Sequence, residues 1–334
     1  MAHKQQRATL ADVAREAGVS MMTVSRVIHG TGRISDDTRQ HVREIIEKME
    51  YRPNRAARTL VTKRTFTIGF VAPDITNPYF TEILQGVEEF FWREGYNVLL
   101  ANSNENPDRE KAILEQLEDT MVDGVIVCSS RLSDDELLPL IAKHAAVVAV
   151  NRNLPQHLGS VVTTRHPRGY RAVLAAKYLH ETGRQRIGYI NLVRSISSVN
   201  LDMFMRELQS LEIPINPNWY ATCQPNWQAG YDTASQLIAG HPELDAIIAG
   251  NDLVALGAMR AAKQYGRHIP DDLALIGGDD ILMASQVTPA LTTFRSDKYN
   301  IGTTAAKLLL QRIGGDMTYC EHHYQDELII REST

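Results

Sequence analysis

Most of the chain alternates short runs of strand-forming residues with stretches of helical spacing, and this alternation restricts the fold more than any other feature. From Phe66 onward the strand-forming runs read TIGFVAP, YNVLLANS, DGVIVCSS, VVAVNR, RIGYIN, DAIIAG and LALIGG. Strands that alternate with helices are typical of a parallel sheet with crossover helices. We therefore expect residues 65–334 to form an α/β domain.

The strand-forming runs fall into two groups, on either side of an extended stretch at Ser160 to Thr164. Two groups predict two similar parallel-sheet subdomains with a cleft between them. In such folds ligands bind outside the carboxyl ends of the strands. The chain has no GxGxxG, GxxxxGK[ST] or GxSxG sequence, so the motifs of a dinucleotide site, a P-loop and a hydrolase are missing.

Charge is distributed unevenly along the chain. Met1 to Arg64 carries 13 Lys and Arg against 7 Asp and Glu, a net charge of +6, whereas the rest carries 22 against 33, a net charge of −11. A basic module ahead of an acidic body suits a polyanion-binding head, because cationic side chains near phosphates release counterions. Charge alone leaves an ordinary solvated basic surface as an equal alternative.

The basic module has the pattern of a helix-turn-helix. Thr9 and Asp12 form a capping box ahead of a first helix to about Ala17, and Gly18 can adopt the left-handed conformation that ends it. Ser20 caps a second helix, which we expect through His29. A third helix follows Ser35 and runs to Glu50. The predicted three-helix core contains Val24, Val27, Ile28, Val42, Ile45, Ile46 and Met49.

These residues resemble the headpiece of the lactose-repressor (LacI/GalR) family of bacterial regulators. The resemblance rests on TLADVAREAGVSMMTVSRVIHG and ISDDTRQHVREIIEKMEYRPNRAARTL. It implies a DNA-binding domain at 1–52 and a hinge helix and linker at 53–64, followed by an effector-binding and dimerisation domain at 65–334. It also implies that Met21, Met22 and Arg26 read bases, and that phosphates are contacted by Thr9, Ser20, Thr23, Ser25 and Asn54.

The chemistry of the base-reading residues agrees in part. Arg26 can make a bidentate pair with guanine, whereas Met21 and Met22 offer only apolar contact, suited to a thymine methyl group. The alternative is that the methionines pack a core.

The hinge carries Arg55, Ala57, Arg58 and Leu60, and so short a helix is marginal alone. By the resemblance, two hinge helices lie in the minor groove and Leu60 is wedged into a base step, which kinks the DNA. A solvated linker is the alternative for this segment.

The body resembles the same family's effector domain, which has a periplasmic-binding-protein-like fold. The matching stretches include VAPDITNPYFTEILQGVE, HETGRQRIGYI, GNDLVALGAMRAA and IPDDLALIGGDDI. We expect one subdomain at about 65–162 with 293–320, and the other at about 163–292 with 321–334. The effector contacts implied by position are Tyr79, Phe80, Asn251 and Asp279, with Trp227 as a further candidate; Asp279 could instead cap a turn.

Two departures from the family pattern put an ordinary neutral-sugar site in doubt. Arg165 and His166, followed by Arg168, stand where the family usually has an aspartate and an asparagine. Asn200 replaces an arginine that grips sugar hydroxyls, and Met203 replaces a glycine. The first three residues could make a cationic site for a phosphorylated or carboxylated effector. Equally, they could be surface residues of a regulator that has lost its effector response.

The three cysteines, Cys128, Cys223 and Cys320, are odd in number and far apart, so we expect reduced thiols. Cys320 with His322 and His323 lacks a fourth ligand and fixed geometry, which argues against a metal site, and no cofactor is implied. The chain has no run of eighteen uncharged apolar residues and no apolar signal-peptide core near Met1. We therefore expect a cytoplasmic protein that does not contact a membrane.

Three functions remain in consideration. The first is a regulator, which the resemblance implies is a repressor, that binds a near-palindromic DNA operator as a homodimer. A small-molecule effector, a sugar or sugar derivative, would control it. The second is a solute-binding protein, which the basic headpiece argues against. The third is an enzyme, for which the sequence shows no identifiable set of nucleophile, base and oxyanion donor. Because one headpiece buries little DNA surface, we expect the body to supply a dimer contact.

Overall fold

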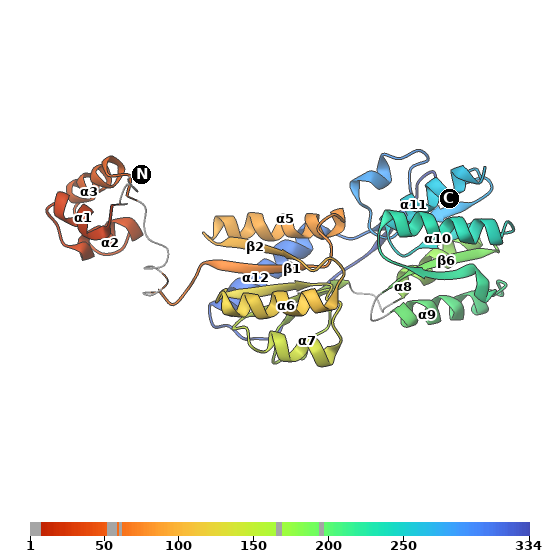
Figure 1. Cartoon of the computed structure of the whole chain (residues 1–334), viewed down its shortest axis with the longest axis horizontal. Coiled ribbons are helices and arrows are strands. Elements are labelled where there is room, and N and C mark those ends of the chain that lie inside the picture. The colour runs from red at the N-terminus through yellow and green to blue at the C-terminus, as the bar shows by residue number, and fades with distance from the viewer. Residues whose placement is uncertain (1–7, 52–58, 60–61, 165–168, 194–196) are drawn as a thin grey trace, which may run out of the picture. The chain divides into compact units, whose positions relative to one another are not determined.

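The computed structural model describes residues 8–51, 59, 62–164, 169–193 and 197–334, with only the backbone described for 29, 164 and 197–200. The chain divides into two compact units, Met1–Thr65 and Phe66–Thr334. Figure 1 labels their elements. Each unit has a core of its own and is described separately.

The first unit contains α1 (Leu10–Glu16), α2 (Met21–His29) and α3 (Asp36–Lys48). The predicted capping box is confirmed, because the Thr9 hydroxyl oxygen accepts from the Asp12 amide and the Asp12 carboxylate accepts from the Thr9 amide. The Ser20 hydroxyl accepts from the Thr23 amide at 3.1 Å, which begins α2. Gly18 has a φ of +65°, the left-handed conformation expected between α1 and α2.

The core of the first unit is the predicted one. Its buried members are Val13, Ala14, Ala17, Val24, Val27, Val42 and Ile45, with Ile28, Ile46 and Met49 packed against them. Two helix ends differ slightly from the expectation, since α1 stops at Glu16 and α3 stops at Lys48. Glu50 has a φ of +47°, which is incompatible with continuing α3.

The second unit begins with a six-stranded parallel sheet in the order β11-β5-β4-β3-β1-β2. Its strands are β1 (Thr67–Ala72), β2 (Asn97–Asn102), β3 (Gly124–Cys128), β4 (Val147–Val150), β5 (Ser160–Thr164) and β11 (Glu321–Tyr324). Side chains alternate between the two faces of each strand, so Ile68 and Phe70 enter one core and Val71 enters another. Helices α5 (Pro78–Arg93) and α12 (Lys298–Ile313) cover the first face, and α6 (Pro107–Asp119) and α7 (Asp134–Ile141) cover the second.

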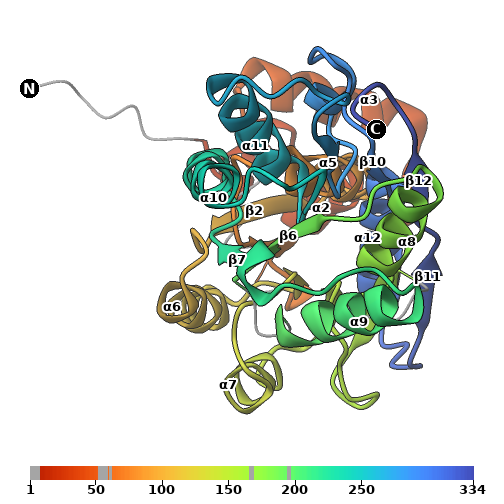
Figure 2. The same ribbon diagram turned by 90° about the vertical axis from the view of Figure 1, so that its right-hand side faces the viewer.

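A second parallel sheet has the order β7-β6-β8-β9. Its strands are β6 (Ile187–Leu192), β7 (Tyr220–Cys223), β8 (Ala246–Ala249) and β9 (Ala274–Ile276). On one face lie α8 (Tyr170–Glu181) and α9 (Ser197–Ser210), and on the other lie α10 (Trp227–Gly240) and α11 (Asp252–Gln264). Figure 2 turns the view by 90° so that this subdomain faces the viewer. The two parallel-sheet subdomains expected from the sequence are confirmed.

The C-terminal part of the chain contributes elements to the two subdomains in turn. Strand β10 (Thr293–Arg295) pairs antiparallel with β12 (Glu327–Ile329) beside the second sheet, and Phe294 and Leu328 pack into its core. Between them α12 and β11 belong to the first subdomain. Two of the expected subdomain boundaries therefore change. Residues 321–324 belong to the first subdomain, although the sequence placed them in the second. Residues 293–295 belong to the second subdomain, although the sequence placed them in the first. Strand β11 reads EHHY and carries no apolar signal, which is why the boundary was misplaced.

Among the described residues, no helix is both long enough and apolar enough to cross a membrane. The cysteines are free thiols, as expected, with Cys128 and Cys223 buried and Cys320 half-buried.

Candidate functional site

The first unit presents an exposed surface on α2. Met21 and Met22 are 55% and 63% exposed, whereas Val24 and Val27 on the other side of the helix are buried in the core. The alternative in which the methionines pack a core is therefore wrong. Arg26 is exposed as well, and its side chain runs beside Gly32. One side of α2 thus fixes the fold and the other offers an apolar and a cationic group to a partner.

The hydroxyl groups around this surface also cap helices. The Thr9 hydroxyl donates to the Asp12 carboxylate at 2.6 Å, and this bond lowers the pKa of Asp12. The hydroxyl proton of Thr9 is therefore already donated to a hydrogen bond. The Ser20 and Thr23 hydroxyls share one hydrogen bond of 2.9 Å, which leaves one proton of the pair for another acceptor. Ser25 is half-buried on α2. Asn54, Arg55, Ala57, Arg58 and Leu60 lie outside the described residues.

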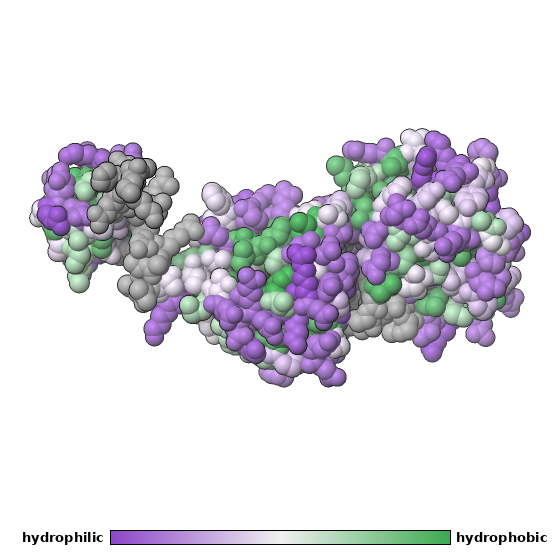
Figure 3. Space-filling view, in the orientation of Figure 1, coloured by the Kyte–Doolittle hydropathy of each residue, from purple (hydrophilic) through white to green (hydrophobic). Residues whose placement is uncertain are grey.

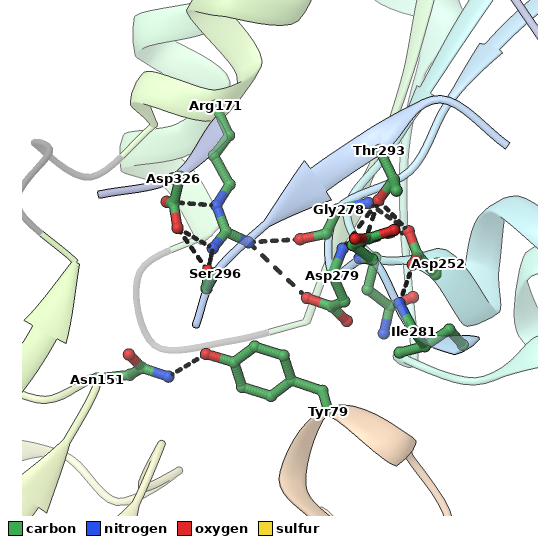
Figure 4. A network of polar contacts seen from close by, with 12 residues as sticks. Tyr79, Asn151, Arg171, Asp252, Gly278, Asp279, Ile281, Thr293, Ser296 and Asp326 are labelled. Carbon is green, nitrogen blue, oxygen red and sulfur yellow. Dashed lines mark hydrogen bonds and ion pairs between the residues drawn. The ribbon is translucent and has the colours of Figure 1, made fainter. Parts of the chain in front are cut away.

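In the second unit, polar groups gather at the carboxyl ends of the strands of the first sheet. Tyr79 lies in the first turn of α5, after β1, and Asn151 directly follows β4. The Asn151 amide donates to the Tyr79 hydroxyl at 2.7 Å (Figure 4). It also donates to the Ser129 hydroxyl at 3.3 Å. Ser129 and Asn151 have φ values of +49° and +56°. Such backbone strain in non-glycine residues concentrates at functional sites.

Tyr79 and Phe80 differ in their chemistry. Burial raises the pKa of Tyr79, so its phenol stays protonated and can both donate and accept. Phe80 is a core residue, with its ring edge-on to that of Tyr79 at a centroid distance of 5.2 Å. Both side chains belong to the same core cluster, with Tyr79 7% and Phe80 3% exposed, and the effector contact expected of Phe80 stays a prediction.

Asn251, at the carboxyl end of β8, is fully buried and its side chain is used internally. Its amide oxygen accepts from the Val254 amide at 2.9 Å, which caps α11, and its amide nitrogen donates to the Pro225 carbonyl at 3.3 Å. Asn251 therefore caps α11, and its amide retains a second N–H and a second oxygen lone pair. The effector contact expected of it stays a prediction.

Asp279 follows β9, and hydrogen bonds of its backbone amide and carbonyl hold it in place. Its amide donates to Asp252 at 3.2 Å and to the Thr293 hydroxyl at 3.1 Å, and its carbonyl accepts from the Lys298 ammonium at 2.9 Å. Its carboxylate lies 3.8 Å from the Arg171 guanidinium. The turn is thus held by main-chain bonds of Asp279, and its carboxylate lies beside Arg171. Asp280, next to it, pairs with Arg295 and Arg331 instead.

Asp252 organises this loop, and sequence reasoning missed it. The carboxylate is fully buried and accepts from the amides of Gly278 at 2.7 Å, Asp279 at 3.2 Å and Ile281 at 2.9 Å, and from the Thr293 hydroxyl (Figure 4). Burial raises its pKa, and these hydrogen bonds oppose that effect. The available sequence signal was the position of Asp252 in GNDLVALG, directly after Asn251.

Arg171 is the second residue that sequence reasoning missed. It lies in the first turn of α8, and its guanidinium bonds to Asp326, Ser296 and the Gly278 carbonyl (Figure 4). Burial by itself would lower the pKa of Arg171, but the Asp326 charge and hydrogen bonds outweigh it and the pKa is raised. The group is permanently charged.

Comparison with known proteins identifies the fold and its relatives. Residues 9–54 match the family described as bacterial regulatory proteins of the lacI family. Residues 65–331 match the family described as periplasmic binding proteins and sugar binding domain of the LacI family. The chain belongs to the LacI family.

Individual LacI-family relatives agree over almost the whole length. The HTH-type transcriptional repressor PurR of Haemophilus influenzae (strain PittEE) is 33% identical over 334 residues, 98% of each chain. A transcriptional regulator CelR–cellobiose complex is 28% identical with a TM-score of 0.71 and covers 98% of this chain and 100% of its own. The lac repressor dimer bound to operator, 24% identical, shares the fold with a TM-score of 0.85 over 98% of this chain and 99% of its own.

The structure says less about the other residues that the LacI-family resemblance implies as effector contacts. Trp227 begins α10, is 42% exposed and stacks parallel on Tyr231, with the ring centroids 5.7 Å apart. The Tyr231 hydroxyl in turn donates to Gln264 at the end of α11. One face of Trp227 is therefore covered by its own helix. Asn200 lies on α9 with its side chain undescribed, and Arg165, His166 and Arg168 lie outside the described residues.

Proposed function

We propose that this LacI-family chain is a transcriptional repressor that binds a near-palindromic operator as a homodimer and is controlled by a small molecule bound in the cleft of its larger unit. One observation carries the proposal: α2 of a complete helix-turn-helix exposes Met21, Met22 and Arg26 while its other side is packed in the core. The second helix of such a motif is the one that enters the major groove.

The DNA contacts follow from the exposed groups. Arg26 donates a pair of hydrogen bonds to guanine, and Met21 and Met22 contact thymine methyl groups or exclude other bases. Ser20, Thr23 and Ser25 are proposed to contact phosphates, whereas Thr9 would do so only by giving up its bond to Asp12. Asn54 stays a proposed phosphate contact, and the hinge residues Arg55, Ala57, Arg58 and Leu60 keep their proposed minor-groove role.

The effector contacts are proposed at the facing edges of the two sheets. Tyr79 and Asn151 supply a phenol and an amide, and Asp279 supplies a carboxylate. Groups of this kind hydrogen-bond to hydroxyls, which supports a sugar or sugar derivative. The proposed preference for an anionic sugar rests on Arg165, His166 and Arg168 alone, because the guanidinium of Arg171 is already paired with Asp326.

A homodimer is supported by an apolar surface on the larger unit. Strand β2 is the edge of its sheet, and its Leu99 and Leu100 are 42% and 38% exposed. Figure 3 shows hydrophobic residues gathered over α5 and β2. An exposed apolar edge strand invites pairing, and a second copy of this chain is the occupant that a palindromic operator requires.

We also propose that the protein has no enzymatic activity and acts in the cytoplasm. Among the groups described at the carboxyl ends of the first sheet's strands, the Ser129 hydroxyl accepts from Asn151, and the Tyr79 phenol and the Cys128 thiol are buried. Burial raises the pKa of Cys128 to about 12, so the thiol stays protonated. Free cysteines and a DNA-binding unit fit a reducing compartment that contains DNA.

The test is selection of duplexes from a random-sequence library by the full chain, followed by thermal shift with cellobiose, D-ribose and D-ribose 5-phosphate. We expect a recovered site with two-fold symmetry and a higher melting temperature with at least one ligand. Recovery of unrelated sequences would refute the DNA-binding part. A larger shift with D-ribose than with its phosphate would refute the anion preference.

A further inference from the structure

The chain passes between the two subdomains of the larger unit three times, and the side chain of Arg171 links two of these passages. The passages are 165–169 between β5 and α8, 296–297 between β10 and α12, and 325–326 between β11 and β12. Arg171 lies just after the first passage. Its Nε and Nη2 donate to the two carboxylate oxygens of Asp326, in the third passage, at 2.8 and 2.9 Å. Its Nη2 also donates to the Ser296 hydroxyl, in the second passage, at 2.8 Å.

The two partners of Arg171 are buried, whereas the Arg171 side chain itself is 30% exposed. The Asp326 side chain is 2% exposed, Ser296 is 3% exposed, and the Ser296 hydroxyl also donates to Asp326. A planar guanidinium that bonds a carboxylate through two parallel N–H groups fixes direction as well as distance, which a lysine ammonium cannot do. Buried ionic groups of this kind are better suited to specifying one geometry than to adding net stability.

The same guanidinium reaches the cleft. Its Nη1 donates to the Gly278 carbonyl and lies 3.8 Å from the Asp279 carboxylate, a proposed effector contact. Lys298 contacts the same loop. Its ammonium donates to the Asp279 and Asp280 carbonyls and lies 3.3 Å from the carboxylate of Glu82 on α5. The loop after β9 that carries Asp279 and the passages at 296–297 and 325–326 therefore meet at Arg171.

We propose that Arg171 is a positioning residue whose guanidinium holds the passages at 296–297 and 325–326 against α8 in one relative geometry, and thereby sets the angle between the subdomains and the operator affinity of the protein. A ligand that contacts Asp279 then acts on the hinge through the same side chain. The inference rests on the proposed function, because the angle between the subdomains affects DNA only if the chain is an effector-controlled regulator.

The experiment measures the distance between the subdomains in the full chain. Spin labels on cysteines introduced at Glu115 of α6 and Gln228 of α10, both exposed, report it by double electron–electron resonance. Cys320 is replaced by serine, and labelled chains are diluted with unlabelled ones. The variants are Arg171→Ala, Arg171→Lys and the control Arg186→Ala, which removes a 3.3 Å surface pair with Asp245 within one subdomain.

We expect a broadened or displaced distance distribution in both Arg171 variants and an unchanged one in Arg186→Ala. A purely structural role would lower the melting temperature of Arg171→Lys but leave its distribution equal to that of the parent, and that result overturns the inference. Should Arg171→Ala fail to fold, Arg171→Lys and Asp326→Asn carry the same comparison.

The second readout is affinity for a duplex selected by the parent protein. We expect about a tenfold change in Kd for Arg171→Lys, which corresponds to about 1.4 kcal/mol, and none for Arg186→Ala. Equal affinities of parent and Arg171→Lys contradict the inference. If the parent selects no duplex, the proposed function fails, while the distance measurement still decides whether Arg171 sets the angle.

Discussion

Replacing Asp252 with alanine tests whether one buried carboxylate holds the loop that carries Asp279. The change removes the acceptor of the Gly278 and Ile281 amides and of the Thr293 hydroxyl, and one of the two acceptors of the Asp279 amide. Their donors are buried or nearly so, and water cannot reach all of them without opening the loop. The loss should therefore appear in the free energy of unfolding of the larger unit.

The magnitude follows from those four bonds. At about 1 kcal/mol net for each bond, the loss is about 4 kcal/mol. Burial raises the pKa of Asp252, so the charged form is disfavoured in the fold, and removing it returns part of that loss. We expect Asp252→Ala to lower the free energy of unfolding by about 3 kcal/mol. Asp252→Asn keeps one acceptor oxygen and should lose about 2 kcal/mol.

The assay is urea unfolding of the full chain at pH 7, followed by circular dichroism. Asp119→Ala is the matched control, because Asp119 is an exposed carboxylate at the end of α6. A loss below about 0.5 kcal/mol for Asp252→Ala, similar to an ordinary surface substitution, would refute the reasoning.

Three further predictions concern the DNA surface, acid stability and the dimer. Arg26→Ala should weaken operator binding by about 1 to 3 kcal/mol and relax the preference at one base position in each half-site, as measured by gel retardation; equal losses on operator and random DNA would make Arg26 a phosphate contact. Burial would raise the pKa of Asp280, but hydrogen bonds from Arg331 and Arg295 lower it below 3.8. Its ionised form therefore stabilises the fold above pH 3.8, and this contribution is lost as the pH falls through the lowered folded pKa. The stability difference between the parent and Asp280→Asn, from urea unfolding across a pH series, should shrink in that acidic range, and a constant difference would contradict the assignment. Leu100→Asp should convert the dimer to a monomer in sedimentation, with an unchanged melting temperature; a dimer of parental affinity would place the contact elsewhere.

The sequence was most informative where structure is local. The caps Thr9, Ser20 and Ser35 precede helices whose own residues satisfy them within three positions, so a short stretch of sequence contains the whole interaction. The apolar spacing of Val24 and Val27 likewise needs only the helical period. The helix-turn-helix and its exposed α2 surface could therefore be predicted in detail.

The cleft was predicted less well because its contacts join distant parts of the chain. Arg171 bonds to a residue 155 positions away, and Asp252 bonds to Thr293, 41 positions away. No local pattern marks such partners. Asn251 and Phe80 occupy the expected places after or beside strands, yet position alone cannot show whether a side chain faces the cleft or caps a helix.

The most direct test of the account is fluorescence anisotropy of the full chain with three labelled duplexes: the selected site, one half-site alone and a scrambled sequence. The account predicts that the selected site binds at least about a thousandfold more tightly than the scrambled duplex, and that the half-site loses most of that preference because a dimer engages both halves. Equal affinity for the selected and scrambled duplexes would contradict it.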